Sequence, residues 1–94
     1  MKLKMHPHLR AFICVHVLAN SKPILLVTRA DGGDWCFLCG DANHNDASSI
    51  RAVGIIHIFE RDPTLLELQD LDVDWDAERE AVGKPWMRTK SLPN

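Results

Sequence analysis

The stretch that most constrains the fold of this chain covers residues 31–41, with the sequence DGGDWCFLCGD. Two adjacent glycines between aspartates indicate a tight turn, because glycine adopts the positive φ angles that such turns require. The residues that follow alternate between two apolar sets, Trp35, Phe37 and Cys39 on one side and Cys36 and Leu38 on the other. This alternation predicts a strand over residues 35–39 that is packed on both faces.

Two apolar stretches before this turn predict two further strands. Residues 11–18 are apolar on both faces, which favours a central strand, and residues 24–29 form a second strand after a polar turn. Because the links between the three strands are short, we expect them to form an antiparallel meander.

The second half of the chain predicts short helices and contains one ambiguous segment. Residues 53–59 are rich in β-branched side chains and favour a fourth strand, while a helix over residues 49–60 is the alternative. Asp62 before Pro63 predicts the start of a helix, because aspartate caps free N–H groups and proline suits the first helical position. Residues 77–82 are another short helix candidate, and Trp86 after it is expected to pack against the core.

Chain length and composition indicate one globular domain. The chain has 94 residues, of which 46% are hydrophobic and 26% are charged, as is usual for a small folded domain. We therefore predict a single α+β domain over residues 1–94, with an antiparallel sheet of three to four strands and short helices packed on one face. Residues 1–9 are expected to form a basic arm and residues 90–94 a frayed tail.

Charge is distributed unevenly along the chain, although the formal net charge is only −2. Residues 60–80 carry nine acidic residues against two arginines. The small total charge argues against nucleic acid as a partner, and the acidic segment favours a cationic one. The odd count of three cysteines favours a reducing, cytoplasmic location. A membrane partner is not expected, because no apolar run reaches the ~20 residues of a spanning helix.

Alternating aspartates in this acidic segment are candidate partner-binding residues. Asp70, Asp72, Asp74 and Asp76 alternate with three apolar residues. In an extended segment these aspartates would share one side and form an acidic ridge. Together with Asp41, His44 and Asp46 in the loop after the third strand, they are predicted to bind a protein partner with a basic surface. Trp75 occupies the position where an EF-hand loop requires glycine, which excludes that motif.

Cys36 and Cys39 have the C-x-x-C spacing of zinc and redox sites. On a strand, however, positions i and i+3 face opposite ways, which favours two structural thiols and no metal or other cofactor. The alternative hypothesis is a small zinc-binding or thiol-redox protein, in which Cys14, Cys36, Cys39 and His44 form the site.

Nothing in the sequence indicates a catalytic arrangement. His57 lies among aliphatic residues and is interpreted as a hydrogen-bonded core residue. A nucleophile pair of His57 with Cys14 or Cys39 is accompanied by no nucleophile elbow and no glycine-rich phosphate loop. The sequence therefore favours a protein without enzymatic activity.

Three segments carry a resemblance to known proteins. They are residues 34–41 (DWCFLCGD), 61–63 (RDP) and 86–88 (WMR). Together they resemble a set of small bacterial proteins of unknown function and, more distantly, the immunity proteins of polymorphic toxin systems. This resemblance implies a protein-binding module without catalytic activity, of the toxin-neutralising type.

Overall fold

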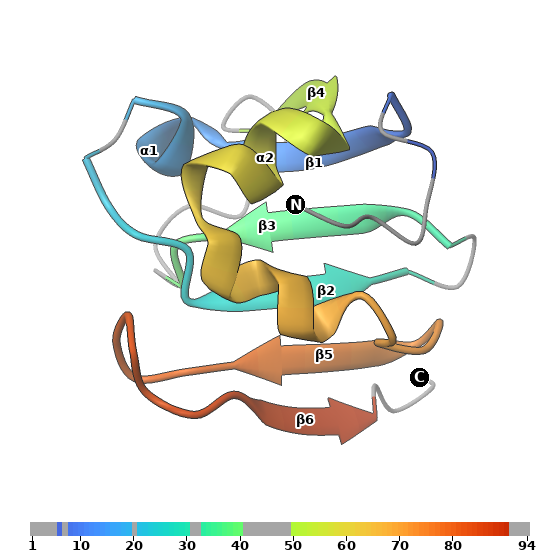
Figure 1. Cartoon of the computed structure of the whole chain (residues 1–94), viewed down its shortest axis with the longest axis vertical. Coiled ribbons are helices and arrows are strands. Elements are labelled where there is room, and N and C mark those ends of the chain that lie inside the picture. Colours follow the sequence, from blue (N-terminus) through green and yellow to red (C-terminus); the bar gives the residue numbers. More distant parts are fainter. Residues whose placement is uncertain (1–5, 7, 20, 31–32, 41–49, 91–94) are drawn as a thin grey trace.

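A computed structural model describes residues 6, 8–19, 21–30, 33–40 and 50–90. Among these residues, six strands form one sheet in the order β4-β1-β3-β2-β5-β6 (Figure 1). The strands are β1 (Arg10–Cys14), β2 (Leu26–Arg29), β3 (Trp35–Leu38), β4 (Ile50–Gly54), β5 (Trp75–Glu78) and β6 (Met87–Lys90). The helices are α1 (Val15–Leu18), α2 (Ile55–Arg61) and the 3₁₀ helix η2 (Pro63–Leu68).

The sheet is mixed rather than antiparallel. β1 and β3 pair in parallel, with Ala11 opposite Trp35 and Ile13 opposite Phe37, while the other neighbouring strands pair antiparallel. The predicted meander is therefore correct for β2 and β3 but wrong for β1, because β3 lies between β1 and β2. The link after β1 includes α1 and is too long for a hairpin turn.

Two predicted strands are shorter than expected, because each is followed directly by a helix. The strand expected over residues 11–18 ends at Cys14, and residues 15–18 form α1. The ambiguous segment contains both of its alternatives, since β4 ends at Gly54 and α2 begins at Ile55. Both apolar stretches were identified correctly, but in each of them the backbone changes from strand to helix partway along.

The segment that follows η2 differs most from its prediction. The helix expected over residues 77–82 is absent, because residues 75–78 form β5, where Ala77 pairs with Val27. The acidic segment is not extended as a whole either, since Asp74 has a φ of 68° and the backbone N–H of Trp75 bonds to the carbonyl of Asp72 at 3.1 Å. A turn at this point breaks the alternation on which the predicted ridge depends.

The core lies between one face of the sheet and the helices α2 and η2, which cover that face in Figure 1. The Phe37 ring is stacked on Trp35 at 6.0 Å between centroids and meets Phe59 of α2 edge-on at 6.1 Å. Leu65 and Leu68 of η2 are buried in the same cluster. The expectation of short helices on one face of a sheet is confirmed.

The predicted arm and tail at the two ends of the chain are described only in part. Lys90, expected in a frayed tail, is the last residue of β6, and residues 91–94 lie outside the described part. Of the predicted basic arm, His6 accepts a bond from the N–H of Leu9 at 3.0 Å, as in a turn. The radius of gyration is 12.3 Å, against about 12.4 Å for a compact domain of this length. In the described part of the chain, no helix is both long and apolar enough to cross a membrane.

Candidate metal centre

Three potential metal ligands from three different elements meet at one end of the sheet. Cys14 is the last residue of β1, His16 belongs to α1, and Cys39 directly follows β3. One ligand atom from each residue lies within 4.8 Å of the other two. The Sγ of Cys39 lies 4.0 Å from the Nδ1 of His16.

The parallel pairing of β1 and β3 explains why the two cysteines meet. Parallel strands end at the same edge of a sheet, and Ile13 is paired with Phe37 just before both strands finish. Cys14 and Cys39 follow these paired residues by one and two positions. The helical turn of α1 begins at once and keeps His16 beside both thiols.

The two thiols of the cluster are more deeply buried than its imidazole. Cys14 is fully buried and Cys39 is 4% exposed, whereas His16 is half-buried. Gly40 then turns the chain with a φ of 80°, a conformation that other residues rarely adopt. A Cβ at this position would also lie 3.4 Å from the Cβ of Leu25. Glycine at position 40 therefore suits the sharp turn of the backbone directly after Cys39.

The donor set and its spacing fit a thiophilic cation. Thiolate and imidazole are the preferred ligands of Zn²⁺, whereas Mg²⁺ and Ca²⁺ prefer oxygen. Two ligand atoms on a tetrahedral zinc ion lie roughly 3.5–3.8 Å apart, given metal–ligand bonds of about 2.0–2.3 Å. The observed 4.0 Å between sulfur and nitrogen needs only a small adjustment. Three protein ligands of this kind would fill three of the four positions around a zinc ion.

Cys36 does not belong to this group, although the sequence paired it with Cys39. Within the described residues, the close ligand atoms come from Cys14, His16 and Cys39. Burial raises the pKa of the Cys36 thiol, and a nearby Cys14 raises it further, while a hydrogen bond with Thr28 acts in the opposite direction. Cys36 therefore stays a neutral thiol to a higher pH than an ordinary thiol does.

The alternative zinc set of the sequence, which was Cys14, Cys36, Cys39 and His44, differs from the cluster in the structure. The structure joins Cys14 and Cys39, leaves out Cys36 and adds His16. His44, together with the predicted partner-binding residues Asp41 and Asp46, lies outside the described residues. The signal that could have found His16 is its position two residues after Cys14, which keeps an imidazole close to a thiol along the chain.

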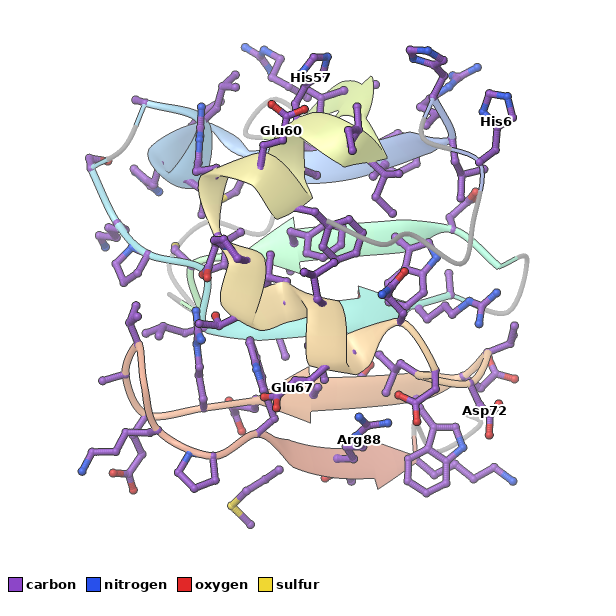
Figure 2. All side chains as sticks on the ribbon, viewed as in Figure 1. His6, His57, Glu60, Glu67, Asp72 and Arg88 are labelled. Carbon is purple, nitrogen blue, oxygen red and sulfur yellow. The ribbon has the colours of Figure 1, made fainter. Side chains whose placement is uncertain are left out.

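The predicted acidic ridge is dispersed over different surroundings. Asp70 forms an ion pair with Arg88 at 3.0 Å, and Asp72 is exposed at the start of the turn that leads into β5 (Figure 2). Asp74 is half-buried, and its N–H bonds to the carbonyl of Arg29 at 2.8 Å. Asp76 lies within β5. These four residues therefore form no continuous extended ridge.

His57 is also placed differently from its prediction. It was expected in the core, but it is exposed on α2, and Figure 2 shows it projecting outward. The period of a helix explains the difference, because Ile55, Ile58 and Phe59 take the buried side of α2. An exposed His57 gives no support to a nucleophile pair with the buried Cys14 or Cys39.

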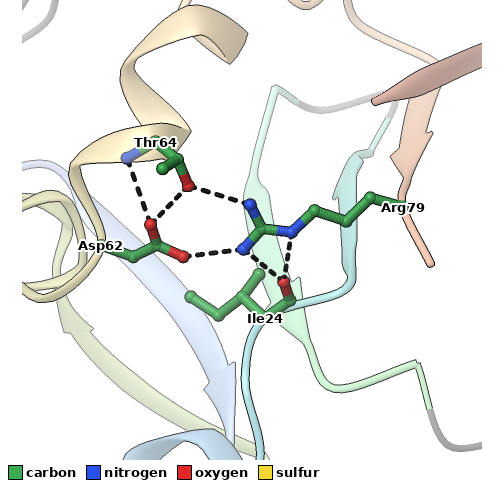
Figure 3. A network of polar contacts seen from close by, with 4 residues as sticks. All are labelled: Ile24, Asp62, Thr64 and Arg79. Atoms are coloured by element: carbon green, nitrogen blue, oxygen red, sulfur yellow. Dashed lines mark hydrogen bonds and ion pairs between the residues drawn. The ribbon is translucent and has the colours of Figure 1, made fainter. Parts of the chain in front are cut away.

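A second buried polar cluster surrounds Arg79 (Figure 3). Its guanidinium donates to the Ile24 carbonyl at 3.0 and 2.8 Å, to Thr64 Oγ1 at 2.9 Å and to Asp62 Oδ2 at 2.8 Å. Asp62 also accepts the N–H of Thr64 at 3.1 Å, which confirms the predicted helix start. The predicted packing of Trp86 is confirmed as well, since the Arg79 guanidinium lies 4.3 Å from its ring centroid. This cluster joins η2 to β5 and to the segment before β2 through bonds within the protein.

Comparison of the chain with protein-family models, with curated proteins and with solved structures finds no match.

Proposed function

We propose that the protein binds a thiophilic divalent cation, with zinc as the leading candidate, at Cys14, His16 and Cys39. The observation that carries this proposal is the convergence of their three ligand atoms within 4.8 Å. Two thiolates and one imidazole select such a cation by chemical softness. The fourth position belongs to water or to a further ligand.

The surroundings of the cluster favour a metal that holds structure together. The two thiols are almost fully buried, and the three ligands come from β1, α1 and the end of β3. A bound ion would therefore link two neighbouring strands and the helix between them. Both thiols must lose a proton on binding, so the affinity should fall as the pH falls.

The first experiment measures metal content directly. The protein is purified under reducing conditions with zinc in the growth medium, and the metal is quantified by elemental analysis. We expect about one zinc ion per chain, in line with one cluster of ligands. Protein that carries no zinc, and that binds neither added Zn²⁺ nor Co²⁺, would overturn the proposal.

Matched variants then assign the ligands. Cys14→Ser and Cys39→Ser should lose the metal, and His16→Ala should bind it roughly tenfold or more weakly. Cys36→Ser and His57→Ala are the controls, because they change the same residue types outside the cluster. Equal loss of metal in Cys36→Ser and Cys39→Ser would contradict the assignment. In Co²⁺-substituted protein, the thiolate-to-cobalt absorption should fall with each ligand cysteine that is removed.

One sequence-predicted ligand needs its own variant. His44 lies outside the described residues, so the geometry neither includes nor excludes it. Metal affinity that falls in His44→Ala would indicate four protein ligands. An unchanged affinity would indicate that water or another ligand fills the fourth position.

A second candidate function, protein binding, is favoured by the sheet face opposite α2 and η2. By strand register, Thr28, Cys36 and Asp76 share this face. Phe12 and Leu26 on the same face are half-buried, and Glu78 at its rim is exposed. We propose that a protein with a basic, partly apolar surface binds here, in keeping with the toxin-neutralising role that the family resemblance implies. Acidic residues beside apolar ones favour such a partner and would speed its association.

Association kinetics test this second candidate. A partner isolated from the source cell should bind more slowly at high salt and to a variant that combines Asp76→Asn with Glu78→Gln. Phe12→Ser should mainly speed its dissociation. Arg51→Gln on the edge strand β4 is the control. A partner that responds to none of these changes would not be using this face.

A further inference from the structure

The helix α1 forms where its own sequence favours a strand. Two of its four residues, Val15 and Val17, are β-branched, and such residues prefer extended backbone. No side chain caps the start of α1, and its first turn has no acidic residue. A single helical turn is also far too short to be stable by itself. Contacts outside α1 must therefore hold it in place.

Hydrogen bonds from residues outside α1 hold mainly its C-terminal end. Arg61 of α2 donates from Nη1 to the carbonyls of Val17 at 2.7 Å and of Leu18 at 3.2 Å. Ser21 donates to the carbonyl of His16 from its N–H and from its hydroxyl, each at 2.9 Å. These bonds satisfy carbonyls that a helix end leaves without helical partners. The buried side chain of Val17 adds one apolar anchor.

The candidate metal centre would hold the start of α1, as the hydrogen bonds from Arg61 and Ser21 hold its end. Cys14 occupies the position just before the helix, and His16 is its second residue. A metal on these two ligands and on Cys39 would tie the first turn of α1 to the ends of β1 and β3. Any ligand that binds this arrangement more tightly than alternatives shifts the population toward it.

We propose that metal binding orders α1, and that Arg61 is the positioning residue that couples α2 to the metal centre. This inference rests on the proposed metal-binding function. The coupling is reciprocal, because two events that favour the same conformation each strengthen the other by the same factor. The metal therefore stabilises the carbonyl positions that Arg61 binds, and Arg61 in turn strengthens metal binding without contacting the metal.

Hydrogen exchange of named amides tests the first half of the proposal. The N–H of Ala19 bonds to the carbonyl of Val15 at 2.9 Å, and that of Ser21 bonds to the carbonyl of His16. Both amides should exchange roughly tenfold or more slowly when zinc is added to metal-free protein, as in a local opening that the ligand suppresses. The amide of Arg79, which bonds to the Leu25 carbonyl, is the control and should change little.

Metal affinity in an arginine variant tests the second half. Arg61→Ala should weaken zinc binding by roughly 5- to 20-fold in competition with a chelator, within the usual range of coupling between sites. Arg51→Ala removes a comparable cation from the exposed edge strand and should leave the affinity unchanged. A purely structural role of Arg61 would lower thermal stability but not the zinc affinity of the folded protein.

The outcomes separate this inference from the proposed function. Stoichiometric zinc binding with unchanged exchange at Ala19 and Ser21, or with unaltered affinity in Arg61→Ala, would overturn the inference and leave the metal site standing. Absence of zinc binding in the wild-type protein would overturn both.

Discussion

The cluster around Arg79 and the cluster of Cys14, His16 and Cys39 are both buried and polar, but they are built differently. The guanidinium of Arg79 meets a carbonyl, a hydroxyl and a carboxylate at 2.8–3.0 Å. The sulfur of Cys39 meets the imidazole only at 4.0 Å, a distance at which a thiol makes at most a weak hydrogen bond. The first cluster satisfies its charge within the fold, and the second gathers three soft donor atoms within 4.8 Å of one another.

This difference separates a structural role from a binding role. Hard, directional groups at short distances gain their stabilisation as soon as the chain folds. Soft donors held close together gain additional stabilisation when a cation joins them. The comparison predicts that perturbing the first cluster changes stability equally with and without metal, whereas perturbing the second removes a stabilisation that depends on metal.

The largest effect is expected from removing the charge of Arg79. In Arg79→Met the side chain keeps its apolar stem, but Asp62, whose side chain is 16% exposed, loses its partner. Breaking a buried ion pair in this way should cost about 3–5 kcal/mol of unfolding free energy. Chemical denaturation measures the loss, and Arg51→Met on the edge strand is the control. The same loss should appear with and without zinc, and a metal-dependent loss would contradict the proposed division of roles.

The next effect is the stabilisation by zinc. At a free zinc concentration of 100 times its dissociation constant, the folded protein should gain about 2.7 kcal/mol. A chelator should reverse the gain. Thermal unfolding with and without zinc measures it, using Cys39→Ser as the variant that should not respond and Cys36→Ser as the variant that should. An equal response in the two variants would remove Cys39 from the site.

The sequence predicted those parts of the fold that depend on local chemistry. Asp62 and Pro63 were recognised as a helix start because the cap is made within two residues of the chain. The turn before β3 was recognised for a similar reason, since Gly33 has a positive φ of 90°. The apolar alternation at Trp35 and Phe37 also reports directly on the buried face of β3.

The remaining parts depend on residues far away in the sequence. Val15 and Val17 favour a strand, yet they lie in α1, where Arg61, more than forty residues later, donates to the carbonyls of Val17 and Leu18. The sequence predicted a helix beginning at Ala77. In the structure, Ala77 pairs with Val27 and belongs to the sheet. His16 was missed for the same reason, because only the parallel pairing of β1 with β3 brings Cys39 beside it.

A smaller effect is expected from the exposed ion pair of Asp70 with Arg88, which contrasts with the buried pair of Arg79. Its side chains are 66% and 36% exposed, so solvent and salt screen the attraction. Asp70→Asn should therefore cost only about 0.2–1 kcal/mol. Chemical denaturation at low and at high salt measures this cost, which should shrink as salt is added. A cost near that of Arg79→Met would mean that the acidic turn helps to hold the fold together.

The smallest expected effect concerns Cys36, the cysteine outside the metal cluster. Burial raises the pKa of its thiol in the folded protein, so the folded chain keeps this proton at a pH where the unfolded chain has begun to lose it. Below the ordinary thiol pKa both states are protonated, and Cys36 contributes no pH dependence. As the pH rises above that value, the unfolded state binds fewer protons than the folded state, and stability falls. The fall should be shallower in Cys36→Ala than in the wild type when unfolding is measured from neutral to alkaline pH in the presence of a chelator.

The same raised pKa predicts that iodoacetamide modifies Cys36 more slowly than a free thiol at mildly alkaline pH. Zinc should leave this rate unchanged, because Cys36 is not one of the clustered ligands. Protection of Cys36 by zinc would instead place it at the metal centre and restore the C-x-x-C pair that the sequence suggested.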